Sequence, residues 1–263
     1  MKRDSFIGGL RQEDVLVFVG AHPDDETLAG PLLAYCADRC RELVVVSLTK
    51  GESGWNLGKE DLTQTLAQVR AKEFESAVRT LGGTAVTFDY VNGRSRAHPQ
   101  GLAVLELKDA GHRRWTAPGG RDTTAEAIYE RWTEEDGDPA VKLADFLRER
   151  KASLVIALEP EKGVTNHLEH VAATRAVIAA VGQCNRQGGP KLCLHYVVGA
   201  SDAPEAAERI ATSDLSAAGG RDYGRIAQKA KAFYVSQFLF DPAGEPGGER
   251  RTEQCLLRAT DVE

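Results

Sequence analysis

Short apolar runs alternate with longer amphipathic segments along most of this chain. The apolar runs have the length of buried strands and cover 15–20, 43–48, 85–89, 153–158 and 192–198, with a shorter one at 254–257. The segments that predict helices cover 26–39, 60–82, 139–150, 168–183 and 222–234. Strands that alternate with helices predict βαβ units. We therefore expect an α/β fold with a Rossmann-like, doubly wound, mostly parallel sheet and helices on both faces.

Residues 92–138 interrupt this alternation, because they mix Gly, Arg and Glu with scattered aromatic residues. We expect an irregular insertion there, within one domain that spans 1–263. Trp115 or Trp132 could stack on a sugar ring as part of a lid, or could anchor the insertion or form a subunit contact. Anchoring or contact is slightly favoured, since one sequence does not show where a side chain points.

A cluster of ionisable residues directly follows the first apolar run, where the chain reads Ala-His-Pro-Asp-Asp-Glu over 21–26. Open α/β sheets bind ligands outside the carboxyl ends of their strands. Two adjacent carboxylates can divide their tasks, one holding a cation while the other takes a proton. Taken alone, the same residues would more often begin a helix, because Asp and Glu oxygens accept its first N–H groups.

A second cluster, 163–170, follows the apolar run 154–158. His167 and His170 are three residues apart at a predicted helix start, so they face the same side. Alone, they would be solvated helix residues. Together with the first cluster they favour a His, Asp and His ligand set, which suits a catalytic zinc that keeps a fourth position for water.

These two motifs resemble those of the LmbE-like (PIG-L) zinc-dependent de-N-acetylases, which have Ala-His-Pro-Asp-Asp-Glu near the N-terminus and His-x-x-His about two-thirds along the chain. Segments 48–54, 69–77 and 231–237 are similar to further motifs of that family, so the resemblance covers about residues 14–240. It implies the LmbE-like version of the predicted fold. It also implies hydrolysis of the N-acetyl amide bond on an N-acetylglucosamine-type amino sugar or glycoside.

The resemblance implies a role for each residue of the two clusters. His22, Asp25 and His170 would bind Zn²⁺, with Fe²⁺ or Co²⁺ as alternative metals, and Asp24 would be the general base. His167 would be a cationic group that stabilises the oxyanion and protonates the leaving amine.

Other positions are implied as contacts of the substrate, namely Arg70, Glu52 and Asn92. Arg70 could instead pair with a nearby glutamate on an exposed helix face. Glu26 would lie behind the metal ligands or favour a helix N-terminus, and we weigh these two interpretations equally.

The chain departs from the family pattern in two places. Leu168 and Glu169 stand where relatives commonly have Pro and Asp, which keeps both imidazoles and the acid. Asn92 stands where many relatives have an aspartate, which puts the substrate contacts there in doubt.

Charge and composition narrow the partners. With 33 basic and 39 acidic residues the surface is mildly acidic, which disfavours nucleic acid and anionic membranes. No apolar run approaches the roughly 20 residues of a membrane span, and no signal peptide is recognisable. Five scattered cysteines fit a reducing compartment. We expect a cytoplasmic protein that binds a small acylated amino sugar and could be a homo-oligomer.

Two alternative functions remain. The first is an amidase that acts on a thiol conjugate or another acylated amine. The second is a non-hydrolytic, metal-dependent sugar-binding protein, which intact Asp24 and His167 argue against. Dehydrogenase and serine hydrolase motifs are missing, because neither Gly-x-Gly-x-x-Gly follows the first strand nor Gly-x-Ser-x-Gly is complete at 51–55.

Overall fold

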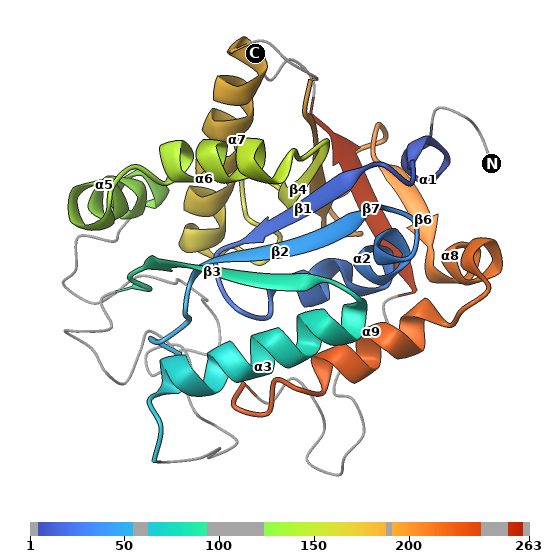
Figure 1. Cartoon of the computed structure of the whole chain (residues 1–263), viewed down its shortest axis with the longest axis horizontal. Helices are drawn as coiled ribbons and strands as arrows, with labels where there is room; N and C mark the ends of the chain where they lie inside the picture. Colours follow the sequence, from blue (N-terminus) through green and yellow to red (C-terminus); the bar gives the residue numbers. More distant parts are fainter. Residues whose placement is uncertain (1–4, 55–62, 94–123, 188–190, 238–251, 260–263) are drawn as a thin grey trace.

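A seven-stranded sheet forms the centre of the protein (Figure 1), whose computed structural model describes residues 5–54, 63–93, 124–187, 191–237 and 252–259. The strand order is β3-β2-β1-β4-β5-β7-β6. The strands are β1 (Val15–Gly20), β2 (Glu42–Thr49), β3 (Thr84–Tyr90), β4 (Leu154–Leu158), β5 (Cys193–Val198), β6 (Glu208–Ala211) and β7 (Glu253–Arg258). Strands β1 to β5 pair in parallel, and β7 runs antiparallel to both of its neighbours. This confirms the predicted α/β class and the mostly parallel sheet.

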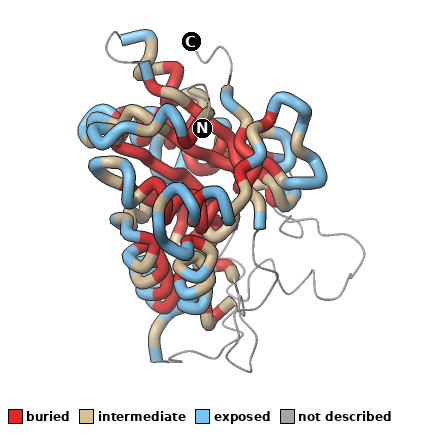
Figure 2. Tube along the Cα trace, turned by 90° about the vertical axis from the view of Figure 1, so that its right-hand side faces the viewer, coloured by how far each residue is buried: buried red, intermediate tan, exposed pale blue. Residues whose placement is uncertain are grey.

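Helices cover both faces of the sheet. One layer holds α5 (Ala125–Asp136), α6 (Pro139–Arg150) and α7 (Leu168–Arg186). The other holds α2 (Gly30–Ala37), α3 (Leu66–Leu81) and α9 (Tyr223–Lys231), with the short helices α1 (Phe6–Gly9) and α8 (Thr212–Gly219) nearby. Buried residues therefore run through the middle of the molecule, between two outer layers of helices (Figure 2).

Strand β1 explains why its apolar run is continuous. Val15, Val17 and Val19 pack into the core under α5, α6 and α7, whereas Leu16 and Phe18 pack into the core under α2 and α3. A strand that is covered on both faces needs apolar residues at every position. The alternation of side chains thus gives this strand a place in both cores.

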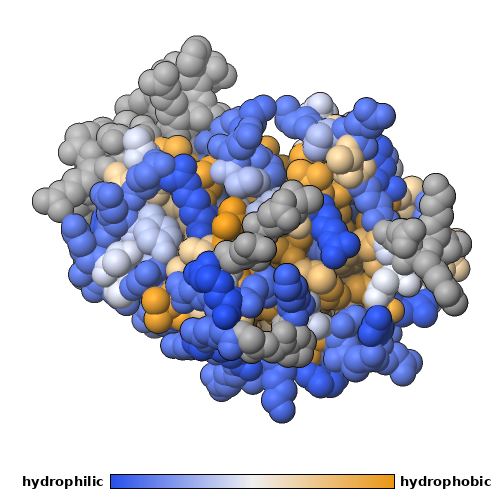
Figure 3. Space-filling view, turned by 90° about the horizontal axis from the view of Figure 1, so that it is seen from above, coloured by the Kyte–Doolittle hydropathy of each residue, from blue (hydrophilic) through white to orange (hydrophobic). Residues whose placement is uncertain are grey.

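Polar residues dominate the outer surface. The view from above shows hydrophilic residues on the ridges and apolar residues mainly in the hollows between them (Figure 3). Among the described residues, Val141 and Phe233 are the large apolar side chains that are exposed.

Two predicted helices begin later than expected. The predicted helix 26–39 is a 3₁₀ turn over Asp25–Ala29 followed by α2, because Asp25 and Glu26 turn inward to the site instead of capping an α-helix. The predicted helix 60–82 begins at Leu66, while residues 60–62 lie outside the described residues. Thr65 stops it there through a capping box, in which its hydroxyl accepts from the N–H of Gln68 and its own N–H donates to Gln68 Oε1.

The expectation of an irregular insertion over 92–138 is wrong for its last part, because α5 occupies Ala125–Asp136. Residues 94–123, including Trp115, lie outside the described residues. Trp132 is fully buried and donates to the carbonyl of Val91 over 3.0 Å, which agrees with the anchoring interpretation. Strand β6 was missed, since a four-residue edge strand has too few apolar positions to show a pattern.

No helix in the described part of the chain is both long enough and apolar enough to cross a membrane. The single domain, the cytoplasmic location, the homo-oligomer and the lack of nucleic-acid binding stay predictions.

His195 on β5 gives a pH-dependent stability that can be measured. It is 9% exposed, and burial, helped by the charge of Arg258, lowers its pKa to about 4. In the unfolded chain a histidine has a pKa of about 6.5, so the unfolded state gains a proton first and stability falls as the pH drops from about 6.5 to 4.

We expect His195→Gln to lose about 2 kcal/mol less stability than the wild type between pH 7.5 and 5, which urea unfolding at both pH values would measure. All other titrating groups are shared by the two proteins. An equal loss in both would show that His195 is not the group responsible.

Candidate active site

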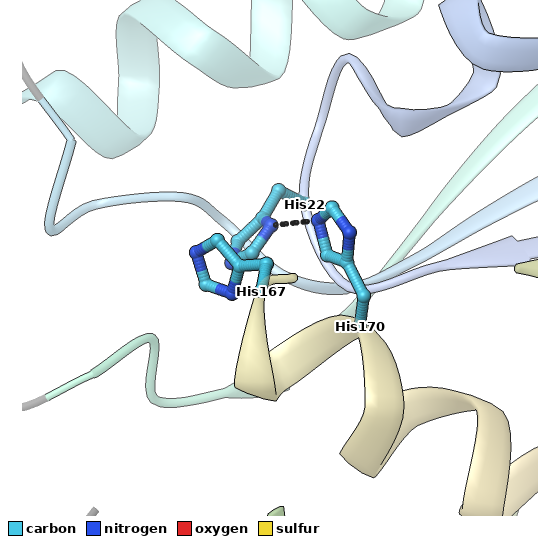
Figure 4. A group of neighbouring side chains, drawn as sticks. All are labelled: His22, His167 and His170. Atoms are coloured by element: carbon cyan, nitrogen blue, oxygen red, sulfur yellow. Dashed lines mark hydrogen bonds between the residues drawn. The ribbon is translucent and has the colours of Figure 1, made fainter. Parts of the chain in front are cut away.

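The two ionisable clusters meet at the carboxyl ends of β1 and β4. These strands are parallel neighbours in the sheet. The strand order reverses between them, since β2 and β3 lie on the side of β1 and β5 lies on the side of β4. His22 and Asp25 follow β1, whereas His167 and His170 stand at the start of α7. Figure 4 shows the three imidazoles close together, with a hydrogen bond between His22 and His170. Such a reversal point is where open α/β sheets hold their ligands.

Three side-chain atoms converge within the cluster. His22 Nδ1 lies 3.2 Å from His170 Nε2, His170 Nε2 lies 3.0 Å from Asp25 Oδ1, and His22 Nδ1 lies 3.8 Å from Asp25 Oδ1. Ligands of a tetrahedral zinc at about 2.0–2.1 Å are separated by about 3.3 Å. The spacing of these three atoms therefore fits one divalent metal ion.

Hydrogen bonds from behind orient both imidazoles. His22 Nε2 lies 2.7 Å from Glu169 Oε2, and His170 Nδ1 lies 2.9 Å from the carbonyl oxygen of Gly163. An acceptor at one ring nitrogen places the proton there and leaves the lone pair on the other nitrogen. His22 Nδ1 and His170 Nε2 are thus the nitrogens that could bind a metal.

Asp25 is held in the same way. Its Oδ2 accepts from the N–H of Ala21 over 2.7 Å and from the N–H of His22 over 3.0 Å, which leaves Oδ1 facing the imidazoles. Burial alone would raise the pKa of Asp25, but the charge and hydrogen bond of His170 outweigh it and hold the pKa well below its usual value. Asp25 is therefore ionised.

The same carboxylates act on His22. Burial would lower its pKa, but hydrogen bonds to Asp25 and Glu169 raise the pKa to about 10. The pocket therefore favours positive charge, and a metal ion that binds there has to displace a proton.

His167 belongs to the cluster but differs from its neighbours. Nitrogens of His22, His167 and His170 all lie within 4.8 Å of one another, so these three imidazoles are a second possible ligand set. The Nδ1 of His167, however, accepts from the N–H of Glu169 over 3.2 Å, and its ring stacks on that of His170 with the ring centres 4.7 Å apart. The set of His22, His170 and Asp25 has the shorter distances between its ligand atoms, at most 3.8 Å.

The prediction of a cationic His167 disagrees with the structure. Burial, together with the charge of His22, lowers the pKa of His167 well below its usual value. His167 is therefore neutral at pH 7. Since its Nδ1 accepts a hydrogen bond, its proton is on Nε2, and it can still act as a hydrogen-bond donor.

Asp24 has an unusual backbone, with φ of 105°, in the left-handed region that non-glycine residues rarely occupy. Arg70 donates to Asp24 Oδ2 over 2.8 Å and also to the carbonyl oxygens of Pro23 and Gly51. Burial raises the pKa of Asp24, although Arg70 opposes this shift. A carboxylate with a raised pKa accepts a proton more readily, as a general base must.

Arg70 therefore holds the predicted base and does not pair with a glutamate on an exposed face. It is 4% exposed and comes from α3. Gly51 makes room for it, because its φ is 63° and a Cβ there would collide with the guanidinium.

Glu26 is buried next to Asp24 and the ionisable cluster. It is 1% exposed, its Oε2 accepts from the N–H of Asp24 over 3.1 Å, and its Oε1 accepts from the hydroxyl of Tyr234 over 2.6 Å. Burial raises the pKa of Glu26 to about 8. These contacts favour the interpretation that Glu26 supports the site over the one in which it favours a helix N-terminus.

Asn92, which the resemblance implied as a substrate contact, forms hydrogen bonds within the protein. Its amide donates to Glu169 Oε2, its Oδ1 accepts from the N–H of Ser53 over 2.9 Å, and its N–H donates to Glu52 Oε1 over 3.0 Å. Both polar groups of the side chain are therefore occupied within the protein. Asn92 and Glu52 together fix the loop beside the site.

Glu169 is the functional residue that the sequence predictions left out. It is 1% exposed and accepts from His22, Asn92 and the N–H of Gly93, while Arg131 lies 4.0 Å from it. The one signal in the sequence was the retained acid between the two histidines. That signal does not show which histidine the acid contacts.

The loop before His167 is strained. Gly163, Val164 and Asn166 all have positive φ, of 60°, 67° and 62°. Val164 is β-branched, so the positive φ costs more free energy there than at the other two residues. A Cβ at position 163 would collide with His170, so glycine is required there.

Comparison with known proteins gives one matching family and several similar proteins. The family model "GlcNAc-PI de-N-acetylase" (PIG-L) matches residues 17–181. A 1D-myo-inositol 2-acetamido-2-deoxy-alpha-D-glucopyranoside deacetylase from Mycolicibacterium smegmatis is 32% identical over 176 residues, which are 63% of this chain and 53% of the relative. The chain spans about half the length of that curated relative.

Solved structures share the fold. The zinc-inhibited form of a teicoplanin deacetylase has a TM-score of 0.58 at 15% identity, with 94% of this chain and 99% of the other covered. The 4-carboxy-2-hydroxymuconate hydratase from Pseudomonas putida KT2440 has a TM-score of 0.51 at 16% identity, with 94% and 96% covered. At such identities the likeness concerns the fold alone, and this fold carries more than one reaction.

The Glu169–His22 contact leads to a test of metal binding. We expect Glu169→Gln to weaken Zn²⁺ binding about 10- to 100-fold, because a neutral amide holds His22 less firmly and presents N–H groups toward Asn92 and Gly93. Competition with a chelator, followed by metal analysis, would measure the affinity. Glu161→Gln changes an exposed glutamate on the preceding loop and is the matched control. Equal affinity in both variants would contradict the role of Glu169.

Proposed function

Because this chain belongs to the PIG-L family, we propose that it is a metal-dependent amide hydrolase that removes the acetyl group from an N-acetylglucosamine-type amino sugar or glycoside. The observation that carries the proposal is the convergence of His22 Nδ1, Asp25 Oδ1 and His170 Nε2, with Asp24 beside them. The deacetylase named among the relatives is itself an amide hydrolase.

We propose Zn²⁺ as the metal, with Fe²⁺ or Co²⁺ as alternatives, held by His22, Asp25 and His170. Two nitrogens and one carboxylate oxygen are typical ligands of a catalytic zinc. When bound, such an ion polarises an amide carbonyl and lowers the pKa of a water molecule. His167 stays outside this ligand set, because its Nδ1 accepts a backbone hydrogen bond and its proton is therefore on Nε2, which leaves no ring lone pair for a metal.

Asp24 accepts the proton of the attacking water. The oxygen of that water forms a bond to the acetyl carbon, and the bond between this carbon and the sugar nitrogen then breaks. The neutral His167 donates a hydrogen bond from Nε2 to the oxyanion. The proton taken by Asp24 is available for the leaving amine, so the products are acetate and a free amino sugar.

The substrate class rests on the similar proteins, in particular on the acetylated glucosamine that the mycolicibacterial deacetylase is named for. A thiol conjugate or another acylated amine is the alternative within the same chemistry. A metal-dependent sugar-binding protein without hydrolysis is the alternative outside it. The pair of Asp24 and Arg70, which holds a base in place, supports hydrolysis.

The test is acetate release from a panel of N-acetylglucosamine glycosides, including the inositol glycoside, with protein reconstituted with Zn²⁺, Fe²⁺ or Co²⁺. We expect at least one sugar to be hydrolysed and chelation to abolish the reaction. Asp24→Asn should lower kcat at least about 100-fold while the metal stays bound, because it removes the base alone. His170→Ala should lose the metal as well.

Asp214→Asn is the matched control, since it changes an exposed aspartate on α8 and should keep full activity. Metal binding without cleavage of any acylated amine would overturn the hydrolase proposal and favour the binding protein. Cleavage of thiol conjugates but not of N-acetyl sugars would replace the substrate class only.

A further inference from the structure

We propose that Tyr234 is a positioning residue for Asp24 that acts through Glu26. The turn after α9, which carries Tyr234, then sets the geometry of the base. The proposal deepens the proposed function and rests on it. Tyr234 is 208 residues from Glu26 in sequence, and its hydroxyl donates to Glu26 Oε1 over 2.6 Å. Glu26 Oε2 in turn accepts from the N–H of Asp24.

Asp24 needs such support, because its backbone is in a conformation that an aspartate does not adopt by preference. Arg70 holds its side chain, and Glu26 holds its backbone N–H. Glu26 is almost completely buried. Its Oε2 accepts from the N–H of Asp24, and Tyr234 holds the other oxygen, Oε1. Without that hydroxyl, the carboxylate could rotate away from the N–H of Asp24.

Tyr234 is itself held firmly. It is fully buried in the turn after α9, and its N–H donates to the carbonyl of Lys231. Two residues further on, Ser236 donates to both carboxylate oxygens of Glu73, from its N–H over 2.7 Å and from its hydroxyl over 2.6 Å. This turn is therefore fixed to α3.

Helix α3 joins the two supports of Asp24. Arg70 and Glu73 are three residues apart on α3, so they lie on one face of the helix. Arg70 reaches the side chain of Asp24, and Glu73 reaches the turn that carries Tyr234. One helix face thus holds both the side chain and, through Tyr234 and Glu26, the backbone of the base.

The family model ends at residue 181, although segment 231–237, which contains Tyr234, also resembles a motif of the family. Neither likeness gives Tyr234 a role, and its assignment comes from its contacts in the structure.

Tyr234→Phe tests the proposal because it removes only the hydroxyl. We expect kcat on the sugar substrate to fall about 10-fold while KM changes less than twofold, since a misplaced base slows the reaction and leaves binding intact. Tyr223→Phe is the matched control. Tyr223 is also fully buried and also donates to a carboxylate, Asp38 Oδ2 over 2.8 Å, but it lies away from the site.

Hydrogen exchange gives a readout that does not depend on activity. The amide of Asp24 should exchange faster in Tyr234→Phe than in the wild type, and Tyr223→Phe should leave it unchanged. Glu26→Gln should lower kcat as well, and the double variant with Tyr234→Phe should lose little more than Glu26→Gln alone, because both changes break one chain of contacts.

Two results would overturn the proposal. One is unchanged exchange at Asp24 in Tyr234→Phe, which counts even if the wild type hydrolyses no sugar. The other is an equal loss of kcat in Tyr234→Phe and Tyr223→Phe, which would indicate a general loss of stability. Failure of the wild type on the whole substrate panel, with faster exchange at Asp24 in Tyr234→Phe, would instead reject the hydrolase and keep the positioning role.

Discussion

The site depends on one buried carboxylate, Glu169. A buried charge is costly unless hydrogen bonds compensate it, and Glu169 finds them on His22, Asn92 and the N–H of Gly93. These partners come from two separate segments, after β1 and after β3, whereas Glu169 itself lies at the start of α7. Satisfying Glu169 therefore requires that the three segments come together, and the same contacts place the proton of His22 on Nε2. The orientation of His22 toward Asp25 and His170 follows from this constraint.

Both segments that carry the ionisable cluster have strained backbone beside it. Asp24 has a positive φ, and so do Val164 and Asn166 before His167. Such conformations persist only where the surroundings hold them. Asp24 is held by Arg70 and Glu26. A site that is fixed before substrate arrives needs little reorganisation during the reaction. Catalysis by positioning requires such a site.

The sequence was sufficient for the parts of the site that follow from local pattern. Ionisable residues directly after two apolar runs predicted that His22, Asp25 and His170 would meet, since parallel strands end at one edge of the sheet. The sequence was not sufficient to predict contacts between distant segments. The contact of Asn92 with Glu169, 77 residues away, and that of Tyr234 with Glu26 depend on the packing of α5 and α9. Helix α5 itself was missed because its polar residues hid its apolar face.

The neutral state of His167 also needed the structure, because its pKa is set by burial and by a neighbouring charge. The same principle separates the two adjacent aspartates. Asp24 and Asp25 are one residue type at consecutive positions, yet burial raises the pKa of Asp24, whereas His170 holds that of Asp25 far down. A carboxylate that stays ionised suits a cation, and one whose proton affinity is raised suits proton transfer. The difference between the two therefore comes from their contacts, since Asp25 is held by the N–H groups of Ala21 and His22 and Asp24 by Arg70 and Glu26.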